Sequence, residues 1–322
     1  WFFYWLAPYP ATMRIWPQFR SALPWDMVAV LTYFTVSLLF WYVGLLPDLA
    51  AARDRAPGTW RRRIYGVFAL GWRGAGRHWK NYRIAYIILA GLATPLVISV
   101  HSIVSLDFAI AQLPGWHSTI FPPYFVVGAI YSGFAMVLML VIPIRAVFHL
   151  ENVITERHLD NLGKMLLAMG LLLAYSYICE VFTAWYSVDQ FEQYTYLFAR
   201  PFGPYAWVYW SMTLANVLTP NLFWWSKLRT NVVALFGAAV VIFVAMWAER
   251  FMLIVTSLNR DFLPSSWHFY APTWVDWGLL IGSLGLFCFL FFAFLRWVPF
   301  IPLSEVKKVR FELRRRVESE LP

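Results

Sequence analysis

Long apolar stretches constrain this chain more than any other feature of its sequence. A helix needs roughly 20 apolar residues to cross a bilayer core about 30 Å thick. Seven stretches reach that length, at about 26–46, 83–105, 124–144, 163–187, 205–225, 230–257 and 274–296. None has the short alternating pattern of a barrel strand. The sequence therefore predicts an all-α, polytopic transmembrane helical bundle that forms one integral membrane domain over residues 1–322.

The composition excludes several other classes of protein. Apolar residues make up 61% of the chain and charged residues 13%, whereas a soluble domain carries about 25% charged residues. This excludes a soluble enzyme, a disordered chain and a disulfide scaffold. Two cysteines, Cys179 and Cys288, are too few for a cluster that needs four thiolates, and His101 is the one histidine in a predicted span. We expect this chain to bind no metal, haem or iron–sulfur cluster.

The lysines and arginines predict the orientation of the spans. Of the 26 basic residues, 21 lie in the segments 47–83, 143–164, 226–230 and 296–322. Four lie in the alternate segments 1–25, 106–123, 188–204 and 258–273. This asymmetry is the positive-inside pattern, which places the basic segments and the tail 297–322 in the cytoplasm. The lipid bilayer is then the expected partner of the basic residues, and nucleic acid is not. Segment 60–82 is predicted to be an amphipathic helix in the headgroup layer.

Polar residues inside the spans are few and mark candidate sites. His101 lies near the external end of the span 83–105, and Ser105 shares its helical face. Asp107 is expected where this helix ends. A histidine and a carboxylate at that depth suit a quinol, whose hydroxyls need proton acceptors as the electrons leave. The alternative is structural, with His101 bonded to a neighbouring helix and Asp107 ending a turn.

A polar stripe in the span 163–187 is a second candidate site. Ser176, Glu180 and Thr183 repeat at helical spacing on one face, and Tyr177 lies a turn away. One carboxylate in such a stripe suits a proton relay or an ion site. A seam of hydrogen bonds between helices is the alternative.

Two further features carry polar groups. Glu249 and Arg250 are adjacent in the span 230–257 and point about 100° apart. Each is therefore expected to face a partner on another helix, with a structural ion pair as the alternative. The external loop 113–124, which contains His117, is rich in proline and aromatic residues and lacks Lys and Arg. We expect it to be a lid over a site or a docking surface for another subunit.

Several runs of the sequence resemble a known family. They include VHSIVSLDFA (100–109), PGWHSTIFPPYFV (114–126), RHLDN (157–161), EVFTAWYS (180–187), WFFYWLAPYP (1–10) and WPQFRS (16–21). These runs strongly resemble the NrfD-like, polysulfide-reductase-type membrane subunits, above all the member designated C in alternative complex III. The resemblance covers most of the chain and is densest in 1–190.

The resemblance implies a fold and a place in a larger machine. Members have about ten helices in two four-helix bundles and a final pair, with about three helices upstream of the point where Trp1 falls, including a histidine of the quinol site. They lie in the bacterial cytoplasmic membrane and bind menaquinol or ubiquinol near the external face. Electrons pass to an iron–sulfur subunit and then to c-type haem subunits, beside a homologous NrfD-like membrane subunit. Members are also proposed to help translocate protons.

These two lines of argument predict the following roles. The catalytic candidates are His101 and Asp107, and the quinol-binding candidates add Ser105 and His117. The proton-pathway candidates are Asp160, Ser176, Tyr177, Glu180, Thr183, Glu249 and Arg250. Two other functions remain open: a secondary transporter or proton channel without redox chemistry, and a structural subunit of the same complex that binds no quinone.

Overall fold

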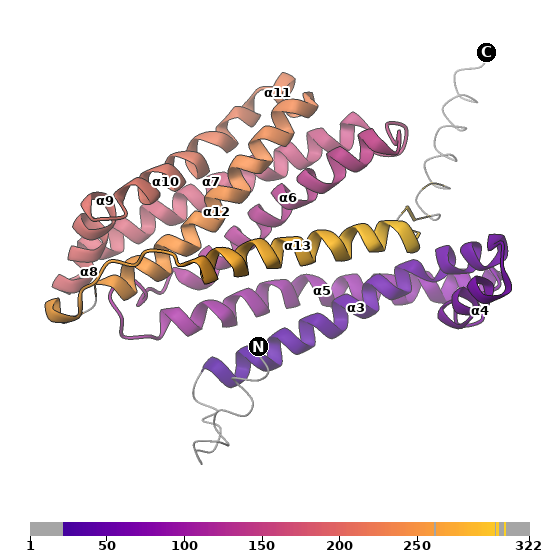
Figure 1. The fold of residues 1–322 in the computed structure, drawn as a ribbon, viewed down its shortest axis with the longest axis horizontal. Helices are drawn as coiled ribbons and strands as arrows, with labels where there is room; N and C mark the ends of the chain where they lie inside the picture. The colour runs from indigo at the N-terminus through magenta and orange to yellow at the C-terminus, as the bar shows by residue number, and fades with distance from the viewer. Residues whose placement is uncertain (1–21, 261, 300, 303–305, 307–322) are drawn as a thin grey trace. The chain divides into compact units, whose positions relative to one another are not determined.

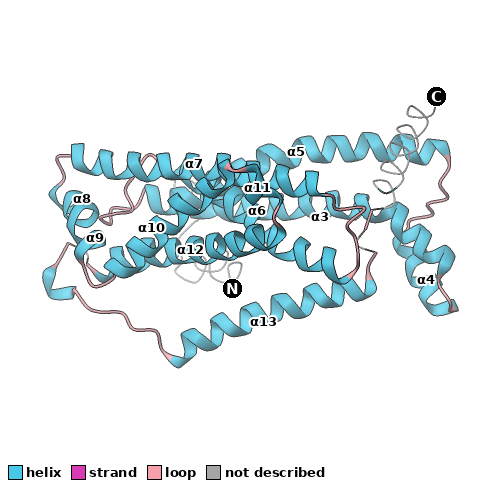
Figure 2. Cartoon of the chain, turned by 90° about the horizontal axis from the view of Figure 1, so that it is seen from above, coloured by secondary structure: helices cyan, strands magenta, loops and turns pink. Residues whose placement is uncertain are grey.

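The computed structural model describes residues 22–260, 262–299, 301–302 and 306, and the elements of this part are helices joined by loops (Figure 1; Figure 2). The longer helices are α3 (Ala22–Arg55), α4 (Thr59–Phe68), α5 (Gly76–Ala109), α6 (Phe121–Val147), α7 (Glu156–Tyr186), α10 (Ala206–Asn221), α12 (Val232–Asn259) and α13 (Trp274–Trp297). The short ones are α8 (Gln190–Tyr194), α9 (Arg200–Phe202) and α11 (Ser226–Thr230). The family-like runs 1–10 and 16–21 and most of the tail 297–322 lie outside the described residues.

The prediction of an all-α membrane fold is confirmed, with one difference in the spans. Six described helices are long and apolar enough to cross a membrane: α3, α5, α6, α7, α12 and α13. The seventh predicted span, 205–225, is α10, which has 16 residues and rises about 24 Å. It contains Pro220 near its end and passes into a 3-10 turn at Leu222–Trp224. The apolar run extends past the end of the regular helix, so its length predicted a longer helical span than α10 provides.

The predicted amphipathic helix over 60–82 is divided in two. The helix α4 ends at Phe68 and α5 begins at Gly76. Between them Leu70, Gly71 and Gly74 adopt positive φ angles of 45°, 70° and 71°. Glycine takes this left-handed conformation without strain and often follows a helix end, so the two glycines separate the helices.

Contacts within the chain group into two compact units. Unit 1 contains residues up to Ala29 and Ile98–Tyr270, and unit 2 contains Val30–Val97 and the residues from Ala271 onward. The boundaries fall inside α3 and α5. The candidate site lies in unit 1.

Unit 1 is built on a four-helix bundle. Helix α6 packs on α7, α7 on α10, α10 on α12, and α12 on α6, which closes the ring (Figure 1). Gly170 of α7 lies directly against the ring of Pro220 of α10, where a Cβ would collide. Small residues permit such close approach of helix backbones. Large apolar side chains fill the centre of the bundle, among them Tyr131, Leu138, Leu166, Leu173 and Ile242.

Unit 2 combines α4 and α13 with the parts of α3 and α5 that follow Ala29 and precede Ile98. Leu45, Leu49 and Ala50 of α3 form a small buried cluster with Ala69. Two tyrosines bond the ends of the helices: Tyr42 donates to the carbonyl of Phe68 at 2.6 Å, and Tyr65 to that of Trp297 at 3.0 Å. Helix α4 is therefore attached to both α3 and α13.

Candidate functional site

A buried ion pair lies at the centre of the candidate site. The Nη1 atom of Arg200 lies 3.2 Å from Oε1 of Glu180, and both side chains are buried. The hydroxyl of Tyr196 lies 2.7 Å from the same carboxylate oxygen, and the Arg200 guanidinium stacks 4.0 Å over the Tyr196 ring. A buried charge is stable only when it is paired and hydrogen-bonded, and this carboxylate meets both conditions.

The local backbone explains how these side chains meet. Glu180 projects from α7, whereas Tyr196 lies in a single π-helical turn, Thr195–Ala199, that joins α8 to α9. Arg200 follows as the first residue of α9. Such π turns are rare in proteins overall, but those that do occur are often found at functional sites. The connection between α7 and α10 is thus folded back so that its one arginine reaches α7.

The external loop joins this pair through the backbone of Gly115. Its carbonyl accepts from Nη2 of Arg200 at 2.9 Å, and its N–H donates to Oε1 of Glu192 at 2.9 Å. Gly115 has a φ of 84°, and a Cβ there would lie 2.8 Å from Oγ of Ser257. Both the conformation and the space therefore require glycine. The Nε1 of Trp116 binds the carbonyl of Leu253 at 2.8 Å and holds the next residue to α12.

Glu192 is a titratable group beside the loop 113–124. Burial raises the pKa of its carboxyl above the ordinary value, and the Gly115 N–H and the Arg200 guanidinium offset part of that effect. The exposed side chain of His117 is near enough for its charge to act on Glu192.

A second polar cluster lies next to the ion pair. Tyr177 of α7 donates to Oε2 of Glu249 of α12, and Nδ2 of Asn216 of α10 donates to the Tyr177 hydroxyl at 2.9 Å. Nη2 of Arg250 lies 3.5 Å from Oε1 of Glu249. The Arg250 guanidinium also stacks 4.0 Å over the ring of Phe125. Glu249 and Arg250 therefore contact each other, and each also contacts a residue of another helix.

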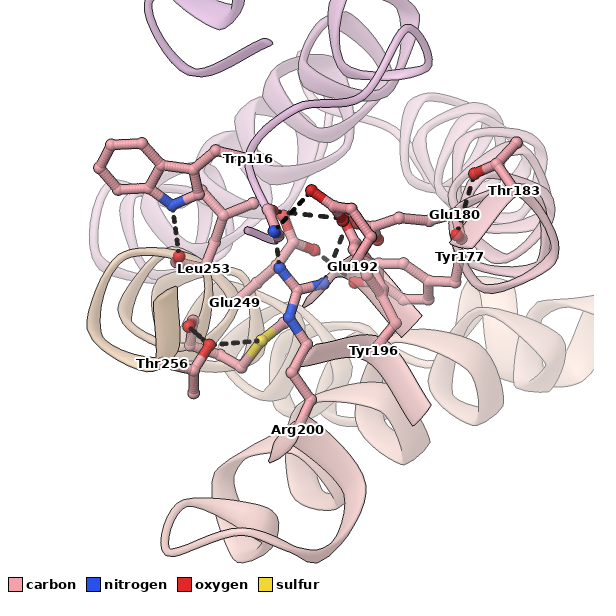
Figure 3. Close-up of polar contacts among 12 residues, drawn as sticks. Trp116, Tyr177, Glu180, Thr183, Glu192, Tyr196, Arg200, Glu249, Leu253 and Thr256 are labelled. Carbon is pink, nitrogen blue, oxygen red and sulfur yellow. Dashed lines mark hydrogen bonds and ion pairs between the residues drawn. The ribbon is translucent and has the colours of Figure 1, made fainter. Parts of the chain in front are cut away.

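The two clusters adjoin on one face of α7, and Figure 3 shows most of their side chains. Tyr177 and Glu180 are three residues apart on α7, so they share a face. We call the set the buried polar network; it consists of Gly115, Tyr177, Glu180, Glu192, Tyr196, Arg200, Asn216 and Glu249. Its side chains come from α7, α8, α9, α10, α12 and the π turn, and Gly115 adds the backbone of a loop, all within unit 1.

Several polar atoms of the network have hydrogen-bonding capacity left over. Among the described residues, no hydrogen-bond partner is found for Nε of Arg200, Oδ1 of Asn216 or Oε1 of Glu249. The buried hydroxyls of Tyr131 and Ser257 are in the same position. Buried polar atoms are normally satisfied by protein groups or water. Unsatisfied buried polar atoms of this kind are suited to binding ordered water.

A pair of carboxylates forms a second candidate site in unit 1. Asp26, in the second turn of α3, is buried, and Asp107, in the last turn of α5, is half-buried. One Oδ1 atom of each has no hydrogen-bond partner among the described residues. The carboxylates are close enough for the charge of Asp26 to act on Asp107.

The other predicted quinol-site residues lie on α5. That helix continues without a break to Ala109, so His101 and Asp107 point about 120° apart around it. His101 is half-buried. Ser105 is buried, and its hydroxyl donates to the carbonyl of Ser102 at 2.6 Å, within its own helix.

Three predicted proton-pathway residues lie apart from the network. The hydroxyls of Ser176 and Thr183 donate to carbonyls of α7 itself, those of Leu172 and Glu180, each at 3.0 Å. Asp160 lies near the opposite end of α7 from Glu180, roughly 30 Å along the helix. It pairs there with Arg229 at 2.7 Å and Lys164 at 2.5 Å.

Sequence reasoning missed Asp26, Glu192, Tyr196, Arg200 and Asn216. Two of them carried a usable signal. Arg200 is one of four basic residues in the external segments, and Asp26 opens an apolar run directly after a tryptophan. The described residues contain no group of three or more His, Cys, Asp or Glu side chains that could hold a metal ion.

Comparison with known proteins shows where this architecture belongs. Residues 10–260 match the family described as polysulphide reductase, NrfD. The chain belongs to the NrfD family. One relative, named as a membrane subunit of dimethyl sulfoxide reductase in Halobacterium salinarum, is 24% identical over 325 aligned positions, covering 88% of this chain and 66% of the relative.

A second relative carries a name that mentions a quinol. It is the Hdr-like menaquinol oxidoreductase integral membrane subunit of Archaeoglobus fulgidus, 24% identical over 241 positions, covering 69% of this chain and 59% of the relative. This NrfD-family chain therefore spans about two thirds of the length of one relative and 59% of the other. Both names are those of membrane subunits of redox enzymes.

Proposed function

We propose that this NrfD-family chain is the quinol-oxidising membrane subunit of a respiratory complex. It binds menaquinol or ubiquinol near the external face of a bacterial cytoplasmic membrane, with its C-terminus in the cytoplasm. It passes electrons to an iron–sulfur subunit and from there to c-type haem subunits. The proposed complex is of the alternative complex III type, with a second NrfD-like membrane subunit. Family membership supports the proposal, and the name of the Archaeoglobus relative favours menaquinol.

The observation that carries the proposal is the pair formed by Asp26 and Asp107. Oxidation of a quinol to a quinone releases two protons and two electrons. The electrons leave to the partner subunit, so this chain has to supply acceptors for the protons. Two carboxylates whose charges act on each other, each with an oxygen that has no hydrogen-bond partner among the described residues, are such acceptors, and we propose that each takes one proton from a quinol hydroxyl.

The charge pattern supports an external position for this reaction. Asp107 lies just before the external loop, and Asp26 lies at the end of α3 remote from the basic segment 47–83. Lys and Arg concentrate on the cytoplasmic side, so both carboxylates fall on the external side. His101, two turns before Asp107, is the proposed hydrogen-bond partner of the quinol head group, with Ser105 beside it and His117 in the loop above.

The buried polar network is the proposed route for protons inside the bundle. Glu249 and Glu180 would exchange protons through Tyr177, with Arg250, Arg200 and Glu192 stabilising the charges at either side. The proposed route reaches the external loop at Gly115. A proton channel or transporter without redox chemistry would use the same groups, so quinol turnover is the property that separates the two functions.

The test is quinol oxidation by the assembled complex that carries Asp26→Asn or Asp107→Asn. Each change removes a proton acceptor and keeps the size of the side chain. We expect kcat to fall by about 10²-fold or more, the usual contribution of a positioned acid or base. His101→Ala is expected to raise KM as well. Asp276→Asn is the matched control, because this carboxylate binds Thr273 at the start of α13 and its replacement leaves turnover unchanged.

Two results would overturn the proposal. Wild-type turnover in both assembled Asn variants would remove the carboxylate pair from the reaction. A purified wild-type complex that contains no quinone and oxidises no added quinol would instead favour the structural subunit or the transporter.

A further inference from the structure

Unit 2 contains a cavity that the proposed function does not use. Its volume is about 290 Å³, at the lower end of the range for ligand sites. Aromatic side chains line it, from Phe40 and Trp41 of α3, Tyr82 and Tyr86 of α5, and Phe294 of α13. These residues lie toward the helix ends that adjoin the basic segment 47–83. The cavity therefore suits an apolar group that enters from the basic side.

A row of aromatic rings connects the cavity with that basic segment. Trp72 lies 5.2 Å from Trp79, which lies 5.8 Å from Tyr82. Tyr82 stacks 5.6 Å from Tyr86, and Tyr86 lies 4.6 Å from Phe40 inside the cavity. Trp and Tyr concentrate at membrane interfaces, where one side is apolar and the other is wet. These rings form an apolar surface that leads from the basic segment to the cavity.

The charges near the cavity determine which end of a bound ligand points outward. Nine lysines and arginines lie in 47–83, and the side chains of Arg61, Arg62 and Arg63 on α4 are exposed. By contrast the cavity lining includes the buried carboxylate of Asp48. The mostly aromatic lining suits an apolar chain, and an anionic group is attracted to the exposed arginines. The ligand that fits is therefore an amphiphile with its apolar chain inside and its negative head outside.

The helix α4 has the pattern of a segment that rests on lipid. Trp60, Val67 and Phe68 share one face and are exposed. Basic residues beside an apolar aromatic face place such a helix in the headgroup layer. The bonds from Tyr42 and Tyr65 hold α4 next to the helices that line the cavity. Its arginines are thus positioned over the same end of unit 2.

We propose that unit 2 binds one anionic glycerophospholipid, with an acyl chain in the aromatic cavity and the phosphate attracted by the exposed arginines of α4, Arg61–Arg63. Clusters of basic residues on an interfacial helix attract anionic lipids by about fivefold per residue. The cavity adds selectivity for a molecule that has a chain, which free phosphate lacks. This site does not depend on the quinol reaction.

The experiment uses the intact complex after removal of endogenous lipid. Dioleoylphosphatidylglycerol or dioleoylphosphatidylcholine is added, and the lipid retained is counted by native mass spectrometry. Gly44→Leu fills the cavity, because a Cβ at Gly44 makes an ordinary 3.5 Å contact with Tyr86. Gly91→Leu is the control, since a Cβ there meets nothing within 4 Å. A triple change of Arg61, Arg62 and Arg63 to Gln removes the charge, and the same triple change to Lys keeps it.

We expect wild type, Gly91→Leu and the Lys triple to retain one phosphatidylglycerol and little phosphatidylcholine. Gly44→Leu and the Gln triple are expected to reduce retention by about fivefold or more. Equal retention of the two lipids, or undiminished retention in either test variant, would overturn the proposal. So would displacement of the lipid by an added quinone at equal concentration. The arginine triple decides the question even if Gly44→Leu fails to assemble, because those side chains are exposed.

Discussion

The two ends of α7 each hold a carboxylate paired with an arginine, but the pairs have different surroundings. At one end Asp160 and Arg229 are 2.7 Å apart with side chains 20% and 15% exposed, and Lys164 beside them is 54% exposed. At the other end Glu180 and Arg200 are 8% and 1% exposed. A partly exposed pair is screened by solvent and contributes less to stability, whereas a buried pair carries a large desolvation cost. The comparison therefore distinguishes an ion pair with a structural role, Asp160–Arg229, from a candidate functional site at Glu180–Arg200.

The further bonds of each arginine support this distinction. Arg229 also donates to the carbonyl of Phe223 at 2.6 Å and so fastens the turn between α10 and α11 onto α7. Arg200 instead binds the external loop at Gly115 and touches Tyr196. Its partner Glu180 is one turn from Tyr177, which leads to Glu249. The further hydrogen bonds of Arg229 go to backbone carbonyls, whereas Arg200 belongs to a network of titratable side chains.

The largest expected effect is on stability, from Arg200→Met. The change leaves Glu180 as a buried, unpaired charge, which costs about 3–5 kcal/mol. We expect the melting temperature of the purified protein to fall by roughly 10 °C. The double variant Glu180→Leu, Arg200→Met is expected to recover much of the loss, because it removes both charges. Arg229→Met is the comparison at the partly exposed end, where we expect a smaller fall, of a few degrees. Equal falls for the two arginine variants would contradict the distinction between the ends.

The same comparison applies to proton movement. Glu180→Gln keeps the size of the side chain but removes its ionisation, so we expect a lower proton-to-electron ratio with quinol oxidation largely retained. Asp160→Asn, roughly 30 Å away along α7, is expected to leave that ratio unchanged. The measurement is proton release into the medium on pulses of quinol with reconstituted vesicles. If Asp160→Asn lowers the ratio and Glu180→Gln does not, the proton route runs through the exposed end.

The sequence predicted the helices better than it predicted the site, for physical reasons. Apolar run lengths and the distribution of Lys and Arg depend on the bilayer, which acts on each segment independently. The pairing of Glu180 with Arg200 depends on a π turn that brings a connecting segment back to α7, and no periodicity reports that. Asp26 and Asp107 are far apart in sequence, and only packing brings their charges within range of each other. Conversely, Tyr177, Glu180 and Glu249 were predictable because ionisable groups inside spans are rare.

The smallest expected effect concerns pH and the external edge of the network. Burial raises the pKa of Glu192, so the folded protein favours its protonated form more than the unfolded chain does. Stability should therefore fall as pH rises from the ordinary carboxyl value through the raised pKa. In Glu192→Gln an amide oxygen still accepts from the Gly115 N–H at the position of Oε1, but nothing titrates. We expect the difference in melting temperature between variant and wild type to shift in favour of the variant from pH 5 to pH 8. A difference that stays constant over this range would mean that Glu192 keeps its ordinary titration in the folded protein.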